Sequence, residues 1–202
     1  MPQDVYFAGP LFDHKHLIGN ALLGREVERQ AGGRYRIVLP QDIEGDSSRA
    51  RDIRNADYSA LTRVEAAIFA FDGSELDSGT VAEYLYAKML DLPAVIFRSD
   101  FRAAGDQDGG DPWNLMCSFF PRTETLAVNA LEAYCAAGCR SQGDLEAYLS
   151  HLGAALLEKL DRALATPPVL ETLSERQEHL ARILRLTGGG IDEMVMNETE
   201  RS

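Results

Sequence analysis

Cysteine is scarce in this chain, with three in 202 residues. Cys117, Cys135 and Cys139 are too few and too irregularly spaced for a disulfide framework. Cys135 and Cys139 would share one face of a helix, but no histidine lies close to them in the sequence, so we expect no metal site. Isolated thiols of this kind are typical of a reducing compartment.

Long apolar runs are also missing. No apolar stretch approaches the roughly 20 residues that a membrane-spanning helix needs. The first residues, Met-Pro-Gln-Asp, lack the basic and apolar regions of a secretory signal peptide. We therefore expect a cytoplasmic protein.

Positive charge is in the minority, with 20 Lys and Arg against 32 Asp and Glu and a formal net charge of −12. This balance argues against a general nucleic-acid binder, because contacts to phosphates need a basic surface. It also slows the capture of anionic small ligands unless a local basic pocket offsets it. A neutral substrate fits the charge best.

Short apolar runs alternate with helical patterns over the first half of the chain. Such alternation predicts an α/β fold with a parallel sheet covered by helices on both faces, in a flavodoxin-like or Rossmann-like arrangement of about five strands. The expected strands cover residues 4–8, 35–39, 66–71, 94–98 and 125–128, and the expected helices of this part lie near 17–32, 47–63 and 80–90.

The character of the sequence changes towards the C-terminus. Amphipathic helical patterns cover residues 144–165 and 169–186, and the first has a leucine stripe typical of a core or a subunit interface. We predict an α/β domain over residues 1–140 and a helical extension over 141–190 that packs on the domain or at a subunit interface. Residues 191–202 form an acidic tail that we expect to fray.

The most informative segment is Asp77-Ser78-Gly79-Thr80-Val81-Ala82-Glu83, which follows the apolar run at residues 66–71. A buried strand leads into an acidic turn that begins a helix, which places Asp77 and Glu83 at the edge of the sheet where open parallel sheets bind ligands. Paired carboxylates in a cleft can cleave a glycosidic bond. The alternative is structural: Asp77 only caps the helix, and Glu83 is only an exposed helix residue.

The two carboxylates would have different tasks. The positive N-terminal end of the helix favours an ionised Glu83, as a nucleophile requires. Asp77, on the loop before the helix, is placed to deliver a proton to the leaving group.

Three motifs together resemble the nucleoside 2-deoxyribosyltransferase family. They are Tyr6-Phe7-Ala8-Gly9-Pro10, the segment from Asp77 to Glu83, and Asn114-Leu115-Met116. Asp57 also lies where that family has an active-site aspartate. The resemblance covers residues 4 to about 120 in the same order.

The resemblance implies a catalytic role for several residues. Glu83 matches the nucleophile that attacks C1′ of a 2′-deoxynucleoside and holds the deoxyribosyl group covalently. Asp77 matches the aspartate that binds the base and helps its protonation, and Asp57 belongs to the same base-binding cluster. Tyr6 matches the tyrosine that positions the nucleophile. A second nucleobase then takes the sugar from Glu83, or water does.

The resemblance also implies a homo-oligomer without metal or cofactor, acting on 2′-deoxynucleosides and free nucleobases. Asn114 matches a residue that reaches into a neighbouring subunit's site to bind the sugar, and Met116 lies beside it. Leu85 stands where the family often has glycine, and we expect it to narrow or reshape the pocket. Further motif residues expected to contact the substrate are Phe7, Gly9, Asp72, Ser78 and Gly79.

Two other functions remain open. Relatives in the same superfamily hydrolyse 2′-deoxynucleoside 5′-monophosphates, but they carry a phosphate-contacting serine where this chain has Asp77, and a carboxylate repels a phosphate. From a different class, the fold could serve a non-catalytic nucleoside sensor. The presence of both acids, Tyr6 and the Asn-Leu-Met segment argues against an inactive site.

Overall fold

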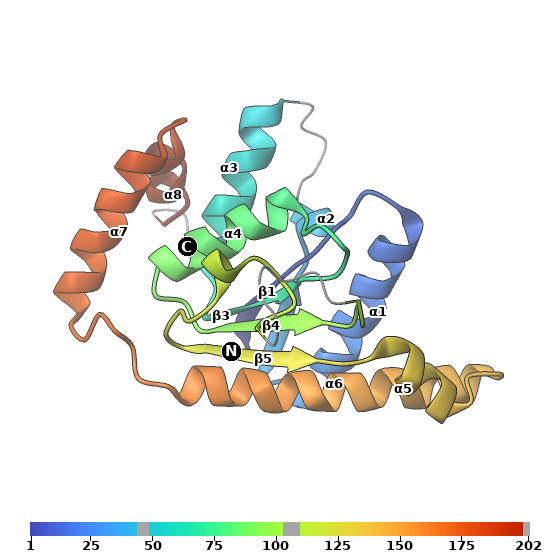
Figure 1. Cartoon of the computed structure of the whole chain (residues 1–202). Helices are drawn as coiled ribbons and strands as arrows, with labels where there is room; N and C mark the ends of the chain where they lie inside the picture. The colour runs from blue at the N-terminus through green and yellow to red at the C-terminus, as the bar shows by residue number, and fades with distance from the viewer. Residues whose placement is uncertain (44–48, 103–109, 200–202) are drawn as a thin grey trace.

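A parallel sheet of five strands forms the centre of the molecule, in the order β2-β1-β3-β4-β5 (Figure 1). The computed structural model describes residues 1–43, 49–102 and 110–199. The strand order is that of flavodoxin-like folds, which confirms the predicted fold class. The strands are β1 (Gln3–Ala8), β2 (Tyr35–Val38), β3 (Ala66–Ala70), β4 (Ala94–Arg98) and β5 (Thr123–Ala127).

The central strands are apolar because helices cover both faces of the sheet. Every residue of β3 and β4 is buried, as expected in a parallel sheet. Side chains of β1 alternate between the two faces. Phe7 packs in the core on one face, and Tyr6 packs in the core on the other.

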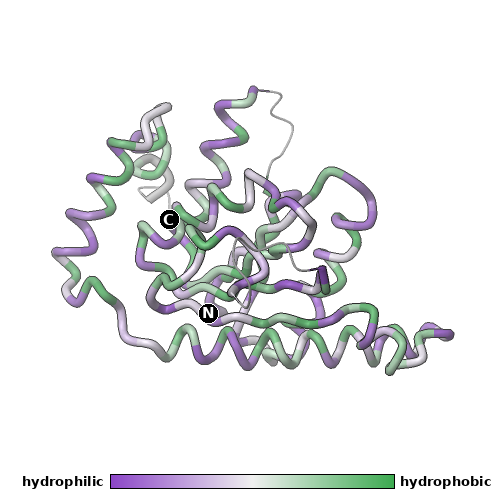
Figure 2. The backbone as a smooth tube through the Cα atoms, in the orientation of Figure 1, coloured by the Kyte–Doolittle hydropathy of each residue, from purple (hydrophilic) through white to green (hydrophobic). Residues whose placement is uncertain are grey.

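Helices α1 (His14–Ala31) and α6 (Gln142–Ala165) cover the first face (Figure 1). Leu156 of α6 is fully buried there in the same core as Phe7. In Figure 2 hydrophilic and hydrophobic residues alternate along α6, the pattern of a helix with one buried side. The first helix of the C-terminal extension is thus part of the main core.

Helices α3 (Ala50–Leu61) and α4 (Ser78–Met89) cover the second face, with the short α2 (Pro40–Ile43) beside α3. Leu61 and Tyr84 are fully buried against Tyr6 and its neighbours. This layer lies on the side of the sheet opposite α6 (Figure 1).

The chain then passes from the first layer to the second. Asp91, at the end of α4, accepts hydrogen bonds from the backbone N–H groups of Val169 (2.8 Å) and Leu170 (3.0 Å) and so fixes the connection. Helices α7 (Leu173–Thr187) and α8 (Ile191–Thr199) follow and lie beside α3 (Figure 1).

The expectation that the acidic tail frays is wrong as far as Thr199. Residues 191–199 form α8, whose Ile191 and Val195 are buried with Leu184 of α7. The apolar residues of the tail therefore find a partner that the local sequence does not reveal. The last three residues lie outside the described part of the chain.

Three further elements were not expected, and the short α2 is one of them. Helix α5 (Ala130–Ala137) has no buried residue, and its sequence signals are the cap Asn129 and the left-handed Gly138 at its end. A single 3-10 turn, Leu115–Cys117, lies before β5. None of the helices in the described ranges is long and apolar enough to cross a membrane.

We predict that Leu156→Ala lowers the free energy of unfolding by about 2–5 kcal/mol, because it leaves a cavity in the core between α6 and the sheet. Urea unfolding measures the change. Leu145→Ala on the same helix, at a side chain that is 45% exposed, is the control and should cost less than about 0.5 kcal/mol. Equal losses for the two variants would contradict the placement of α6 in the core.

Candidate active site

Tyr6, Asp57 and Glu83 meet above the second face of the sheet. The Tyr6 hydroxyl donates a hydrogen bond to Glu83 Oε1 at 2.7 Å and lies 3.4 Å from Asp57 Oδ1. Strand β1 supplies the tyrosine, α3 the aspartate and α4 the glutamate. The fold therefore joins three residues that are far apart in the sequence and that the family resemblance had singled out.

The tyrosine at the centre of this cluster is held in its protonated form. Its side chain is 0% exposed. Burial raises the pKa of Tyr6 far above its usual value, and the negative charges of Glu83 and Asp57 raise it further. The hydroxyl consequently remains a hydrogen-bond donor that fixes one oxygen of Glu83, leaving the carboxylate half-buried at the cavity wall.

Asp77 has the predicted capping role and also faces the cavity. Its Oδ2 atom accepts hydrogen bonds from the backbone N–H of Thr80 (2.7 Å) and from the Thr80 hydroxyl (2.9 Å), which caps α4. Both bonds end on one oxygen of the carboxylate. The structural interpretation of Asp77 is confirmed, and it does not exclude a chemical role.

A cavity of about 380 Å³ connects these groups at the carboxyl edge of the sheet. This size lies within the range of small-molecule sites. Three carboxylates line it, those of Asp57, Asp77 and Glu83. The other lining residues are Gly9, Leu11, Phe12, Pro40, Ala50, Ile53, Arg54, Tyr58, Gly79, Thr80 and Ala82.

The wall at Gly9 depends on the absence of a side chain. A Cβ atom there would lie 3.0 Å from the Cβ of Ala70 and 3.3 Å from the amide nitrogen of Asn20. The loop after β1 therefore approaches β3 as closely as only glycine allows. Gly9 and Gly79 are thus two predicted substrate-binding residues that the fold brings to the cavity.

Phe7 does not lie at this cavity. Since side chains alternate along a strand, the neighbour of Tyr6 points to the opposite face. Phe7 is 1% exposed in the core beneath α1 and α6. Its expected contact with the substrate has to be corrected to a role in packing.

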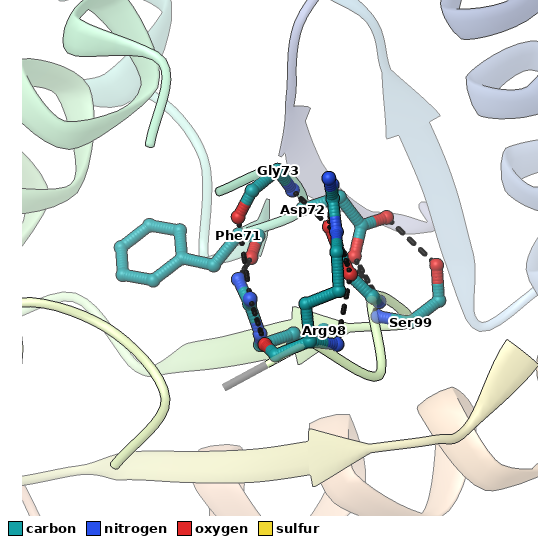
Figure 3. A network of polar contacts seen from close by, with 7 residues as sticks. Phe71, Asp72, Gly73, Arg98 and Ser99 are labelled. Atoms are coloured by element: carbon teal, nitrogen blue, oxygen red, sulfur yellow. Dashed lines mark hydrogen bonds and ion pairs between the residues drawn. The ribbon is translucent and has the colours of Figure 1, made fainter. Parts of the chain in front are cut away.

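Asp72 also has a different task from the expected one. Its carboxylate accepts hydrogen bonds from the backbone N–H groups of Ser99 (2.6 Å) and Asp100 (2.9 Å) and from the Ser99 hydroxyl (2.8 Å). Figure 3 shows this network beside the buried Arg98, which donates to the carbonyl oxygens of Phe71 and Gly73. Together the two side chains tie the ends of β3 and β4 to one another.

Ser78, Asn114 and Met116 line a second cavity, of about 490 Å³. Leu85 lies in its wall as well. On a helix, residues two apart point in nearly opposite directions, so Leu85 points away from the cavity at Glu83. The expectation that Leu85 narrows the pocket beside the nucleophile is corrected accordingly.

The Asn114 segment is exposed in the single chain. Asn114 caps its 3-10 turn by accepting a hydrogen bond from the backbone N–H of Met116 at 2.9 Å. Met116 is 71% exposed and Phe119 94% exposed. These apolar side chains next to the second cavity form a surface suited to contact with another subunit.

Several residues of the cavity wall were not predicted, and Arg54 and Tyr58 are two of them that carry polar groups. The guanidinium of Arg54 lies 4.9 Å from the centre of the Tyr58 ring, and that ring stacks on Tyr86 at 4.3 Å. Arg54 lies three residues before Asp57 and four before Tyr58, so it is a neighbour of both on α3. This spacing was the available signal.

In the part of the chain that the structure describes, no three His, Cys, Asp or Glu side chains are grouped so that they could hold a metal ion.

The family model described as "Nucleoside 2-deoxyribosyltransferase" matches residues 5–116, which is more than half of the chain. No curated protein matches the sequence. Among solved structures, a conserved protein from Enterococcus faecalis V583 is 19% identical, covers 80% of this chain and 99% of its own, and has a TM-score of 0.51. At this identity the likeness shows the fold alone.

Two further solved structures are similar. A 2-desoxiribosyltransferase from Leishmania mexicana is 24% identical, with 67% of this chain and 95% of its own covered and a TM-score of 0.49. A 2-deoxyribosyltransferase from Bacillus psychrosaccharolyticus is 17% identical, with 49% and 74% covered and a TM-score of 0.42.

The protonated state of Tyr6 predicts how stability depends on alkaline pH. An unfolded tyrosine ionises near pH 10, whereas folded Tyr6 keeps its proton to higher pH because its pKa is raised. Its contribution is therefore fully present below pH 10. Above pH 10 the unfolded state loses a proton that the folded state retains, and the free energy of unfolding falls by up to about 1.4 kcal/mol per pH unit.

Tyr6→Phe removes this contribution, so the variant should lose less stability than the wild type between pH 10 and pH 11. Urea unfolding at both pH values measures the two slopes. At neutral pH the same variant should be the less stable protein, because Glu83 loses its donor. Identical slopes above pH 10 would contradict a protonated Tyr6.

Proposed function

This chain belongs to the nucleoside 2-deoxyribosyltransferase family, and we propose on that basis that it moves the 2-deoxyribosyl group between nucleobases through a covalent intermediate on Glu83. The observation that carries the proposal is the 2.7 Å hydrogen bond from Tyr6 to Glu83 in the wall of a cavity that also holds Asp57 and Asp77. The family consists of enzymes of glycosyl transfer, and the roles below are our assignment for this chain.

Glu83 is the proposed nucleophile. The Tyr6 hydroxyl fixes the orientation of this carboxylate through Oε1, and we assign to the carboxylate the attack on C1′ of the bound sugar. The residue lies in the second turn of α4, whose N-terminal end is capped by Asp77. Attack on C1′ breaks the bond to the base and forms a glycosyl ester on Glu83.

We assign binding of the base and its protonation as it leaves to Asp77 and Asp57. Departure of a base is easier when it is protonated, and a carboxyl group beside it can supply the proton. An incoming base, or water, then attacks the same carbon and releases Glu83. Two displacements give retention at C1′, and the reaction of water would appear as side hydrolysis.

The substrates proposed for this site are 2′-deoxynucleosides and free nucleobases. Three carboxylates line the cavity, and they would repel a 5′-phosphate held among them. This charge favours the transferase over the monophosphate hydrolase. We place such an enzyme in cytoplasmic nucleotide salvage of purines or pyrimidines.

We further propose that the chain acts as a homo-oligomer in which Asn114 and Met116 complete the site of a neighbour. Within one chain they line the second cavity and not the cavity at Glu83. Their exposure beside Phe119 fits an interface between copies. No cofactor enters the proposal.

Incubation with a 2′-deoxynucleoside and a different free base should yield the exchanged nucleoside. Glu83→Ala and Glu83→Gln should lower this turnover by at least about a thousandfold, because the nucleophile is lost. Mass spectrometry of the wild type with donor alone should detect the deoxyribosyl adduct. Glu171→Ala, at an exposed carboxylate that lines neither cavity, is the matched control and should retain turnover.

The outcomes separate the three functions. Consumption of a 2′-deoxynucleoside 5′-monophosphate alone, without exchange, would show the hydrolase. Ligand binding without turnover, unchanged in Glu83→Ala, would show a sensor. Either result would overturn the transferase.

A mixing experiment tests the shared site. Glu83→Ala and Asn114→Ala should each be nearly inactive, but subunit exchange between them should restore about a quarter of the wild-type activity, because random pairing unites an intact Glu83 with a neighbour's intact Asn114 at one site in four. Sedimentation of the mixture verifies that oligomers have formed. An active wild type that sediments as a monomer, or a mixture that stays inactive, would refute the proposal.

A further inference from the structure

Arg54 contributes a positive charge to the wall of a cavity that three carboxylates also line. Its guanidinium is held at two atoms. Nη2 donates to the backbone carbonyl of Thr187 at 2.8 Å, and Nη1 donates to Asn55 Oδ1 at 2.9 Å. The plane of the Tyr58 ring supports it at 4.9 Å. Arg54 is therefore a preorganised group, not a free surface arginine.

The second partner of this arrangement is the turn between α7 and α8. Asn55 is 5% exposed and donates to the carbonyl of Gly189 at 2.8 Å. Below the turn, Leu184 and Ile191 pack in one cluster with Tyr58. The C-terminal helices and the turn between them therefore contact the side of α3 that forms part of the cavity wall. They lie outside residues 5–116, where the family model matches.

The position of Arg54 next to Asp57 suggests what it recognises. The two residues are one turn apart on α3 and line the same cavity. Carboxylates can accept hydrogen bonds only from N–H groups of a base, whereas a guanidinium offers N–H donors and needs an acceptor. Arginine pairs well with the carbonyl oxygen and ring nitrogen at the edge of a 6-oxopurine.

We propose that the α7–α8 turn fixes Arg54 as a specificity-determining donor to a carbonyl oxygen of the nucleobase, so that the C-terminal extension takes part in substrate selection. The inference rests on the proposed function, since it assumes that the base binds beside Asp57. It predicts a preference for bases with a ring carbonyl, such as hypoxanthine, over adenine, which has none.

The test compares deoxyinosine with deoxyadenosine as donors for one common acceptor base. These donors differ at the 6-position, where one has an oxo group and the other an amino group. In the wild type kcat/KM should favour deoxyinosine. Arg54→Met should reduce the ratio of the two kcat/KM values by about tenfold or more, mainly through KM for deoxyinosine, and Arg54→Lys should retain part of it.

A pair of glycine variants tests the contribution of the turn. A Cβ atom at Gly189 would lie 2.9 Å from Nη1 of Arg54 and 3.3 Å from Oδ1 of Asn55, whereas at Gly190 no atom lies within 4 Å. Both residues have positive φ angles, +73° and +79°, so alanine strains the backbone at either position. Gly189→Ala should lower the oxo-to-amino ratio, and Gly190→Ala should leave it unchanged.

Equal losses on both donors in the Arg54 and Gly189 variants would show a purely structural role and overturn the inference. Calorimetric titration with free hypoxanthine and free adenine adds a readout that needs no turnover. If the protein acts only on 5′-monophosphates, the proposed function fails, and the titration alone decides the role of Arg54. Equal affinity of the wild type for the two bases would refute that role.

Discussion

The alternation of side chains along β1 is the constraint from which the site follows. Tyr6 and Phe7 are adjacent in sequence, yet Tyr6 contacts the cavity-lining Glu83 and Phe7 fills the core beneath α1 and α6. A shift of the strand by one residue would exchange their faces. The register of β1 between β2 and β3 prevents such a shift, because it is paired on both sides. The chemistry of the site therefore depends on the packing of the sheet.

Negatively charged side chains are concentrated around Tyr6. Three carboxylates line one cavity, and Glu83 and Asp77 differ in the groups that donate hydrogen bonds to them. Glu83 accepts from a tyrosine that burial keeps protonated, and Asp77 accepts from the first turn of α4. Separate environments of this kind allow similar groups to take different roles in one reaction.

Much of this arrangement was visible in the sequence. The five strands were predicted from short apolar runs that alternate with helical patterns, and Tyr6, Asp57, Asp77 and Glu83 were singled out by the motifs and their order. The predictions that were wrong concern the direction in which a side chain points or contacts between residues far apart in the sequence. The side chains of Phe7 and Leu85 point away from the cavity at Glu83. Side chains alternate along a strand, and residues two apart on a helix point in nearly opposite directions.

Contacts between distant segments outside the family motifs could not be predicted. Asp72 reaches the backbone 27 residues later, and Arg54 meets the carbonyl of Thr187 at a separation of 133 residues. No local sequence pattern indicates either of these contacts. For the same reason α8 was expected to fray, since its burial is provided by α7 and Tyr58.

Because the α7–α8 turn contacts α3, separate segments of the chain have different tasks in the molecule. The residues that we assign to bond breaking lie between positions 6 and 83, whereas the turn lies between positions 187 and 190. Replacement or drift of the C-terminal helices during evolution can therefore reshape one wall of the cavity while the carboxylates remain in place. Such a division allows the C-terminal segment, which takes no part in bond breaking, to change which substrates the same reaction accepts.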